Sequence, residues 1–233
     1  MKPLQLYLKL FSEYGPQYWW PVTDKGSSVP TYKPRKRLSE SQKLEVCIGA
    51  ILTQNTSWEN VMKAIVNLNR AELVSVKGII GVSEKKLARL IKPSGYFNVK
   101  AKKLKVFALH VEKKYNGNLK KMFSRRVSEL REELLSIWGI GEETADSILC
   151  YAAGKPVFMV DAYTKRIAER FYGKKFSSYR ELQEFFVSQM NEDSALFSEF
   201  HALLVEHGKR YCTKSSPKCR ECPLAEGCAF APK

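Results

Sequence analysis

Two amphipathic segments joined by a Gly-x-Gly turn constrain the fold of this chain more than any other feature. Residues 128–135 have the apolar spacing of a helix, with Ser128 as the expected N-cap and acidic residues in the first turn. Residues 144–152 repeat that helical spacing after Gly139-Ile140-Gly141. The sequence therefore predicts two helices joined by a tight hairpin, with open backbone N–H groups where the second helix begins.

A hairpin of this kind is either a plain turn or a phosphate site. Backbone N–H groups at a helix N-terminus can hold an anion without reading a base, but the same glycine pattern also occurs in ordinary turns. The segment that follows adds a second signal, because an apolar run over 157–160 leads to Asp161 at the start of the next expected helix.

At these two stretches the sequence resembles the helix–hairpin–helix (HhH-GPD) DNA glycosylases, in which a Val-Asp pair after the hairpin carries the catalytic aspartate. The resemblance gives that role to Asp161 and assigns phosphate contacts to Gly139 and Gly141. It implies an enzyme of base excision repair that binds double-stranded DNA, flips a damaged base and hydrolyses its N-glycosidic bond.

Helical periodicity runs through most of the chain, whereas alternating strand patterns are nearly absent, so we expect an all-α protein. One helix is expected to begin at Ser39, and the expected N-caps are Thr56, Ser83, Asn98, Ser128 and Ser178, with Gly208 closing the last long helix. The resemblance implies the two-lobed endonuclease III-like fold. One lobe would be a six-helix unit over 38–154, and the other would combine 1–37 with 155–233.

The chain has 233 residues and a net charge of +15, which favours a polyanionic partner. A membrane surface is the competing anion, but the basic residues do not form one amphipathic face with bulky aromatic residues. No apolar run approaches the roughly 18 residues of a membrane span, and the N-terminus does not resemble a signal peptide. We expect a monomer in a prokaryotic cytoplasm, associated with the nucleoid.

Six cysteines divide into two groups. Cys47 and Cys150 lie in apolar helical patterns and are expected in the core. The other four have x6, x2 and x5 spacing and are expected to bind metal, which can be zinc or a [4Fe–4S] cluster: Cys212, Cys219, Cys222 and Cys228. The spacing resembles the iron–sulfur loop of endonuclease III, which favours the [4Fe–4S] cluster over 212–228.

Two further positions match DNA-contacting sites of the family, and one lysine outside its motifs is a separate candidate. Gln54, with Asn55, lies in a corner between two expected helices, where the family places a residue that enters the DNA stack. Tyr96 lies in the turn that supplies the second wedge, and Lys165 is a candidate phosphate contact. Without the resemblance, Gln54 and Asn55 would be a turn that satisfies its own backbone.

Several segments resemble the MagIII-type bacterial 3-methyladenine glycosylases, and by that resemblance a base pocket would be formed by Trp19, Trp20, Pro21 and Trp58, with Glu143 adding negative potential. Electron-rich rings suit cationic bases such as N3-methyladenine. The competing interpretation is that these aromatic residues are core.

The bifunctional branch of the family carries a lysine two residues after the last hairpin glycine, where this chain has Glu143. A carboxylate cannot form a Schiff base, so the sequence predicts a monofunctional glycosylase with weak or absent AP-lyase activity. The alternatives are a uracil or thymine mismatch glycosylase, an oxidised-pyrimidine glycosylase/lyase, and a non-catalytic DNA-damage binding protein.

Overall fold

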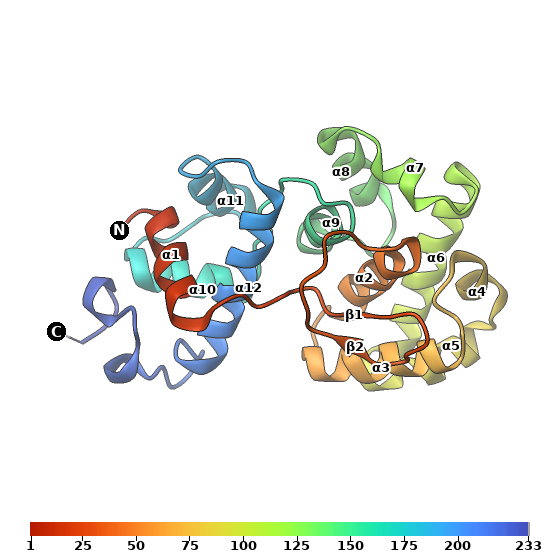
Figure 1. The fold of residues 1–233 in the computed structure, drawn as a ribbon, viewed down its shortest axis with the longest axis horizontal. Helices are drawn as coiled ribbons and strands as arrows, with labels where there is room; N and C mark the ends of the chain where they lie inside the picture. Colours follow the sequence, from red (N-terminus) through yellow and green to blue (C-terminus); the bar gives the residue numbers. More distant parts are fainter. Residues whose placement is uncertain (233) are drawn as a thin grey trace. The chain divides into compact units, whose positions relative to one another are not determined.

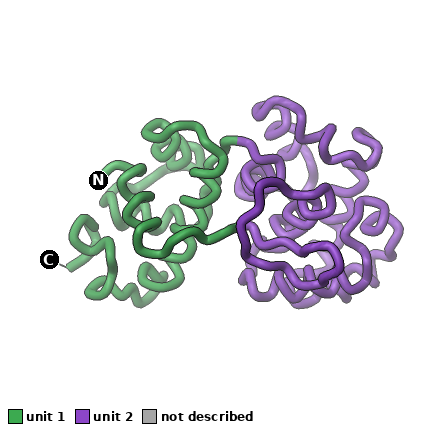
Figure 2. Tube along the Cα trace, viewed as in Figure 1, with its two compact units in different colours: residues 1–19, 156–233 green, residues 20–155 purple. Residues whose placement is uncertain are grey.

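The computed structural model describes residues 1–232, and the chain divides into two compact units (Figure 2). The larger unit comprises residues 20–155, and the smaller unit combines 1–19 with 156–233. The sequence-based division placed 1–37 with the C-terminal segment, whereas residues 20–37 belong to the larger unit. Within the described residues 1–232, no helix is long and apolar enough to cross a membrane.

The larger unit is organised around α2 (Figure 1). Residues 44–52 of α2 are all buried, because other elements cover this helix on every side. The elements of this unit are β1 (Val22–Thr23), β2 (Pro30–Thr31), α2 (Glu40–Leu52), α3 (Trp58–Arg70), α4 (Val76–Gly81), α5 (Glu84–Leu90), η1 (Lys92–Ser94), α6 (Phe97–Tyr115), α7 (Leu119–Phe123), α8 (Val127–Ser136), α9 (Glu142–Ser147) and the π-helical turn η2 (Ile148–Ala152).

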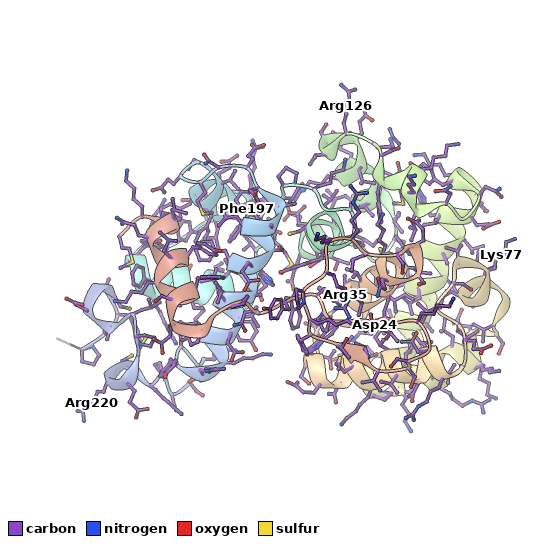
Figure 3. All side chains as sticks on the ribbon, in the orientation of Figure 1. Asp24, Arg35, Lys77, Arg126, Phe197 and Arg220 are labelled. Carbon is purple, nitrogen blue, oxygen red and sulfur yellow. The ribbon has the colours of Figure 1, made fainter. Side chains whose placement is uncertain are left out.

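A two-stranded hairpin departs from the predicted all-α class. β1 and β2 pair antiparallel, with Val22 opposite Thr31. Arg35 Nη2 lies 3.3 Å from both carboxylate oxygens of Asp24, and Figure 3 labels both side chains beside this hairpin. The buried Glu45 accepts from the Thr23 amide at 2.8 Å and joins the hairpin to α2. The protein is still mostly helical, because each strand has only two residues.

The smaller unit packs around phenylalanine rings. Phe158 lies 4.7 Å from Phe186 and 5.7 Å from Phe197 between ring centroids, and all three are fully buried. Figure 3 labels Phe197 on α12. The elements of this unit are α1 (Pro3–Tyr14), α10 (Ala162–Tyr172), α11 (Tyr179–Val187), α12 (Ser194–Arg210) and the 3-10 turns η3 (Cys219–Glu221) and η4 (Ala225–Gly227).

The predicted N-caps are confirmed at Ser83 and Ser178, whose side chains accept from backbone amides three residues on. Ser39, predicted only as the start of a helix, is the N-cap of α2 and accepts from the Gln42 amide. Three other predicted caps are wrong. Ser57 rather than Thr56 precedes α3, since Thr56 is still bonded into the preceding turn through Thr53 O. Tyr96 rather than Asn98 precedes α6, and Arg126 rather than Ser128 precedes α8.

Gly208 does not end α12 as predicted, because the helix continues to Arg210. A Cβ on Gly208 would lie 2.5 Å from Tyr163 Cδ1, so the glycine permits close approach of α10 and α12. The short helices α4 and α7 were not predicted from the sequence; each is only five or six residues long and buries few side chains.

Candidate functional site

The predicted helix–hairpin–helix is formed by α8, the turn at 137–141 and α9. Ile137 and Ile140 are buried, whereas Gly139 adopts φ +89, a left-handed conformation that favours glycine. A Cβ at Gly139 would lie 2.6 Å from Lys103 Cγ, whereas a Cβ at Gly141 would meet no atom within 4 Å. Glycine is therefore required at 139 by backbone and packing, and Gly141 leaves open space where α9 begins.

A buried ion pair joins the two helices of this motif. Arg131 on α8 donates from Nε to Asp146 Oδ1 at 2.7 Å and from Nη2 to Oδ2 at 3.2 Å. Asp146 on α9 is fully buried, so this bidentate contact stabilises its charge. The sequence analysis did not single out this pair; Asp146 could have been noticed as an acid on the apolar face of a helix.

Gln54 links the corner after α2 to the hairpin. Its Nε2 donates to Gly139 O at 3.0 Å and to Thr144 Oγ1 at 2.9 Å, and its Oε1 accepts from Lys103 Nζ. The neighbouring Asn55 is exposed and has φ +54. Asn55 therefore lies at the tip of this corner, and Gln54 is half-buried beneath it.

Lys100 on α6 connects that corner to the turn before α6. Its buried ammonium donates to Leu52 O at 2.8 Å and to Ser94 O at 2.6 Å. Burial, and then the charge of Lys103, lower the pKa of Lys100 to about 8. Tyr96 follows in the same turn with 72% of its surface exposed. We call the three linked segments, residues 53–55, 94–96 and 138–141, the hairpin face.

The predicted aromatic pocket is a packed cluster in this structure. Trp20 and Trp58 are buried edge to face, 5.0 Å between ring centroids, and Tyr151 of η2 lies 5.3 Å from Trp20. A Cβ on Gly49 would lie 2.8 Å from the Trp20 ring, so α2 also contacts it. Tyr151 was not predicted as part of this cluster.

The remaining predicted pocket residues differ in their burial. Pro21 is buried next to Trp20 in the larger unit, whereas Trp19 is half-buried and belongs to the smaller unit. Glu143 lies exposed in the first turn of α9, two residues after Gly141. The position that carries a lysine in the bifunctional branch of the resembled family is thus a solvent-accessible carboxylate in this chain.

Asp161 is the N-cap of α10 in the smaller unit. Its Oδ1 accepts from the Thr164 amide at 2.7 Å, and its Oδ2 lies 3.5 Å from Nε2 of His201 on α12. Burial raises the pKa of Asp161, but the His201 contact and the Thr164 amide outweigh that effect and lower it. The carboxylate, only 12% exposed, is therefore ionised at neutral pH.

His201 was not predicted as a site residue, although a histidine inside an apolar helical pattern is a visible signal. It is 4% exposed. Because α10 and α12 pack against each other, the pairing of His201 with Asp161 depends on tertiary structure.

Lys165 lines an open basic groove on the smaller unit. The groove lies along α10 and the C-terminal segment and includes Lys174, Lys175 and Lys214. Arg166 and Arg170 border it while donating to the carbonyls of Gly208, Cys212, Thr213 and Lys214. These arginines fasten the C-terminal segment to α10, which leaves the lysines as the cations that face solvent.

The four C-terminal cysteines line one pocket with Arg170 and His207. Arg170 Nη1 lies 3.4 Å from Cys212 Sγ, and His207 Nε2 lies 3.6 Å from Cys222 Sγ. Burial, together with the other three thiols, raises the pKa of Cys222. Four thiols in one pocket are a donor set that fits a thiolate-bound metal group. Within residues 1–232, however, no three His, Cys, Asp or Glu side chains lie close enough together to hold a metal ion.

Comparisons with known proteins agree on one family. The model of the HhH-GPD superfamily of base excision DNA repair proteins matches residues 48–191. A candidate DNA repair glycosylase from Methanocaldococcus jannaschii is 41% identical over 227 residues, which cover 96% of this chain and 94% of that protein.

Two solved structures show the same fold. The 3-methyladenine DNA glycosylase MagIII of H. pylori, bound to 1,N6-ethenoadenine, is 28% identical with a TM-score of 0.72, and the match covers 90% of this chain and 98% of that one. A non-covalent endonuclease III–DNA complex has a TM-score of 0.76 at 20% identity, covering 99% and 97%. The chain belongs to the HhH-GPD superfamily of base excision DNA repair proteins.

Proposed function

We propose that this protein is a monofunctional DNA glycosylase that binds duplex DNA and releases alkylated purines such as 3-methyladenine. The observation that carries the proposal is the ionised carboxylate of Asp161, held at the N-terminus of α10 with its pKa lowered. A glycosylase needs such a group, because positive charge develops on C1′ as the N-glycosidic bond breaks.

The reaction would be a hydrolysis. The bond between C1′ and the base nitrogen breaks with its electron pair leaving on the base, while water adds to C1′ and loses a proton. Asp161 would stabilise the positive charge at C1′. It would also orient the attacking water and accept the proton that the water loses. A cationic alkylpurine becomes neutral as it leaves, so a strong general acid is not required.

Glu143 supports a single activity. Strand cleavage by a lyase begins with a lysine amine that attacks C1′ and forms an imine. The residue in the first turn of α9 is a glutamate, and a carboxylate cannot form that imine. Lys165 and Lys155 do not occupy the family's motif position, and Lys165 lies among the lysines of the basic groove. A phosphate contact is the better role for it.

The alkylpurine assignment rests on the aromatic residues and on the likeness to MagIII. Trp20, Trp58 and Tyr151 offer electron-rich rings that suit a cationic base. Because these rings fill one another's surfaces in this structure, a base would have to separate them or stack on their outer edge. Uracil, thymine and oxidised pyrimidines are not cationic, so no cation–π attraction would offset the cost of moving the rings.

The hairpin would supply phosphate contacts without reading bases, with Gln54, Asn55 and Tyr96 near the displaced base. The two glycines make this testable. Gly139→Ala should weaken binding to damaged and undamaged duplexes and lower stability, since φ +89 and the Lys103 contact both disfavour a Cβ. Gly141→Ala should leave stability unchanged, and any loss of DNA affinity would then report a contact at 141 itself.

We further propose that Cys212, Cys219, Cys222 and Cys228 hold a [4Fe–4S] cluster, on the strength of their x6, x2, x5 spacing and their common pocket. Such a cluster would crosslink the C-terminal segment and act in folding rather than in chemistry. About four iron and four sulfide ions per purified chain are expected. One zinc ion per chain would identify the zinc alternative instead.

A base-release assay tests the whole proposal. Duplexes with methylated, deaminated or oxidised bases are incubated with the protein, and free bases and strand breaks are measured with and without alkali. The expected result is release of 3-methyladenine, with strand breaks only after alkali and no borohydride-trapped complex. Release of uracil or thymine alone would reject the substrate class, and efficient trapping would reject monofunctional chemistry. Binding without any base release would favour the damage-binding alternative.

A further inference from the structure

Trp138 is an exposed tryptophan directly before the hairpin. Its neighbours Ile137 and Ile140 are buried at 4% and 6% exposure, whereas Trp138 is 51% exposed. Trp20 and Trp58, in contrast, are buried within the larger unit. A large apolar ring left in water at a turn gains nothing for folding, which raises the question of what contacts it.

A lysine covers one face of this ring. Lys102 Nζ on α6 lies 5.2 Å from the ring centroid, in the range of a cation–π contact. The next residue, Lys103, packs its alkyl chain against Gly139 and donates to Gln54. Trp138 and Lys102 therefore form a combined apolar and cationic surface at the edge of the hairpin face.

The surface continues along α6. Val99, one turn before Lys102 and Lys103, is 49% exposed, and Tyr96 at the N-cap is 72% exposed. Val99 lies three and four positions before Lys102 and Lys103, so these three residues share one side of α6. Exposed apolar side chains at the start of α6 therefore accompany the ammonium group of Lys102.

We propose that Trp138 and Lys102 form a further DNA-binding element, in which the indole packs against deoxyribose while Lys102 binds the adjacent phosphate. This inference rests on the proposed function, because the hairpin must approach a DNA backbone. Charge selects the partner: the chain carries +15, and an ammonium group above an exposed ring offers both surfaces of a sugar–phosphate unit. Such a contact carries no base sequence, so it should act on any duplex.

The chain offers a control in Tyr32. This ring is 47% exposed, close to the 51% of Trp138. Tyr32 follows β2 in the larger unit and belongs neither to the hairpin face nor to the basic groove. A general effect of losing an exposed ring would appear in both variants, whereas a DNA contact specific to the hairpin would appear only at Trp138.

The experiment measures dissociation constants for end-labelled undamaged and damaged duplexes over a range of salt concentrations. Trp138→Ala should weaken binding to both duplexes about tenfold, in line with the lost burial of one apolar ring, without changing the salt slope. Lys102→Ala should weaken both and reduce the salt slope by about one. Trp138→Phe should keep most of the affinity, and Tyr32→Ala should match the wild type.

Tryptophan fluorescence gives an independent readout. Addition of undamaged duplex to the wild type should change the emission of the exposed indole, and Trp138→Phe should remove that change. The thermal unfolding midpoint of each variant should equal that of the wild type. Unchanged affinity in Trp138→Ala, or a fluorescence change that persists in Trp138→Phe, would overturn the inference.

A loss of affinity confined to the damaged duplex would also overturn the inference, since the ring would then contact the base. The binding assay separates this inference from the proposed function. A protein that binds undamaged duplex through Trp138 but releases no base would leave the DNA contact standing and reject the glycosylase.

Discussion

Glu133 in the larger unit and Asp161 in the smaller unit are both buried carboxylates, yet their surroundings differ. Glu133 contacts His110 and Tyr115 at 2.7 Å and Lys114 at 2.8 Å, and Arg125 also binds it. Burial raises the pKa of Glu133, but the hydrogen bonds from Lys114, His110 and Tyr115 outweigh burial and lower the pKa to about 2. Its negative charge is cancelled by cations from α6 and the segment before α8.

Asp161 is held by a different kind of contact. One backbone amide binds Oδ1, and one imidazole, charged only if protonated, lies 3.5 Å from Oδ2. The contacts just named for Asp161 include no lysine or arginine. A carboxylate whose charge is less compensated by neighbouring cations can act more strongly on a developing positive charge.

The largest expected effect is on catalysis. Asp161→Asn should lower single-turnover base release by about 10³-fold, because the amide keeps the shape and loses the charge. Binding to undamaged duplex should stay close to that of the wild type. Glu133→Gln serves as the control, and its base release per folded molecule should be unchanged. Comparable loss of rate in both variants would erase the distinction between the two carboxylates.

The next effect is on stability. Glu133→Gln should lower the free energy of unfolding by about 3 kcal/mol, since it removes the buried charge that the partly exposed Lys114 and Arg125 contact. Denaturant unfolding followed by circular dichroism measures this. Glu181→Gln is the matched control, because the pKa of Glu181 is also about 2 but its side chain is 37% exposed. A change in Glu181→Gln as large as that in Glu133→Gln would show that burial is not the cause.

Lowering the pH should weaken the same ion-pair network around Glu133 gradually. The pKa of Glu133 is lowered on folding, so its contribution to stability is fully present above about pH 4.5 and is lost as the pH falls toward 2. The stability difference between wild type and Glu133→Gln should therefore be constant near neutral pH and shrink by about 2 kcal/mol on acidification. A difference that stays constant down to pH 2 would contradict the network's role.

The smallest effect should come from the imidazole beside the catalytic candidate. His201 lowers the pKa of Asp161, so His201→Leu should move the acidic limb of the pH–rate profile for base release to higher pH. At pH 7 the rate should fall by less than about twofold, as Asp161 would remain mostly ionised. His201→Asn, which keeps an N–H donor, should shift the limb less. Identical acidic limbs in wild type and His201→Leu would remove His201 from the site.

The sequence by itself determined the local elements. Ser39, Ser83 and Ser178 were predictable as caps because a cap bonds to an amide three residues away. The hairpin was predictable because Gly139 needs a left-handed backbone that few other residues adopt. Asp161 at the start of α10 follows the same rule, since its carboxylate accepts from the Thr164 amide.

Only the tertiary structure decided which distant side chains meet. Gln54 bonds to Gly139 across 85 residues, and Asp161 meets a histidine on α12. The sequence left open whether Trp20 lines a pocket or belongs to the core. Its burial against Gly49 depends on how the 20–37 segment packs on α2. Periodicity and capping report bonds within a few residues, whereas long side chains take partners that packing brings near, and no local pattern encodes that choice.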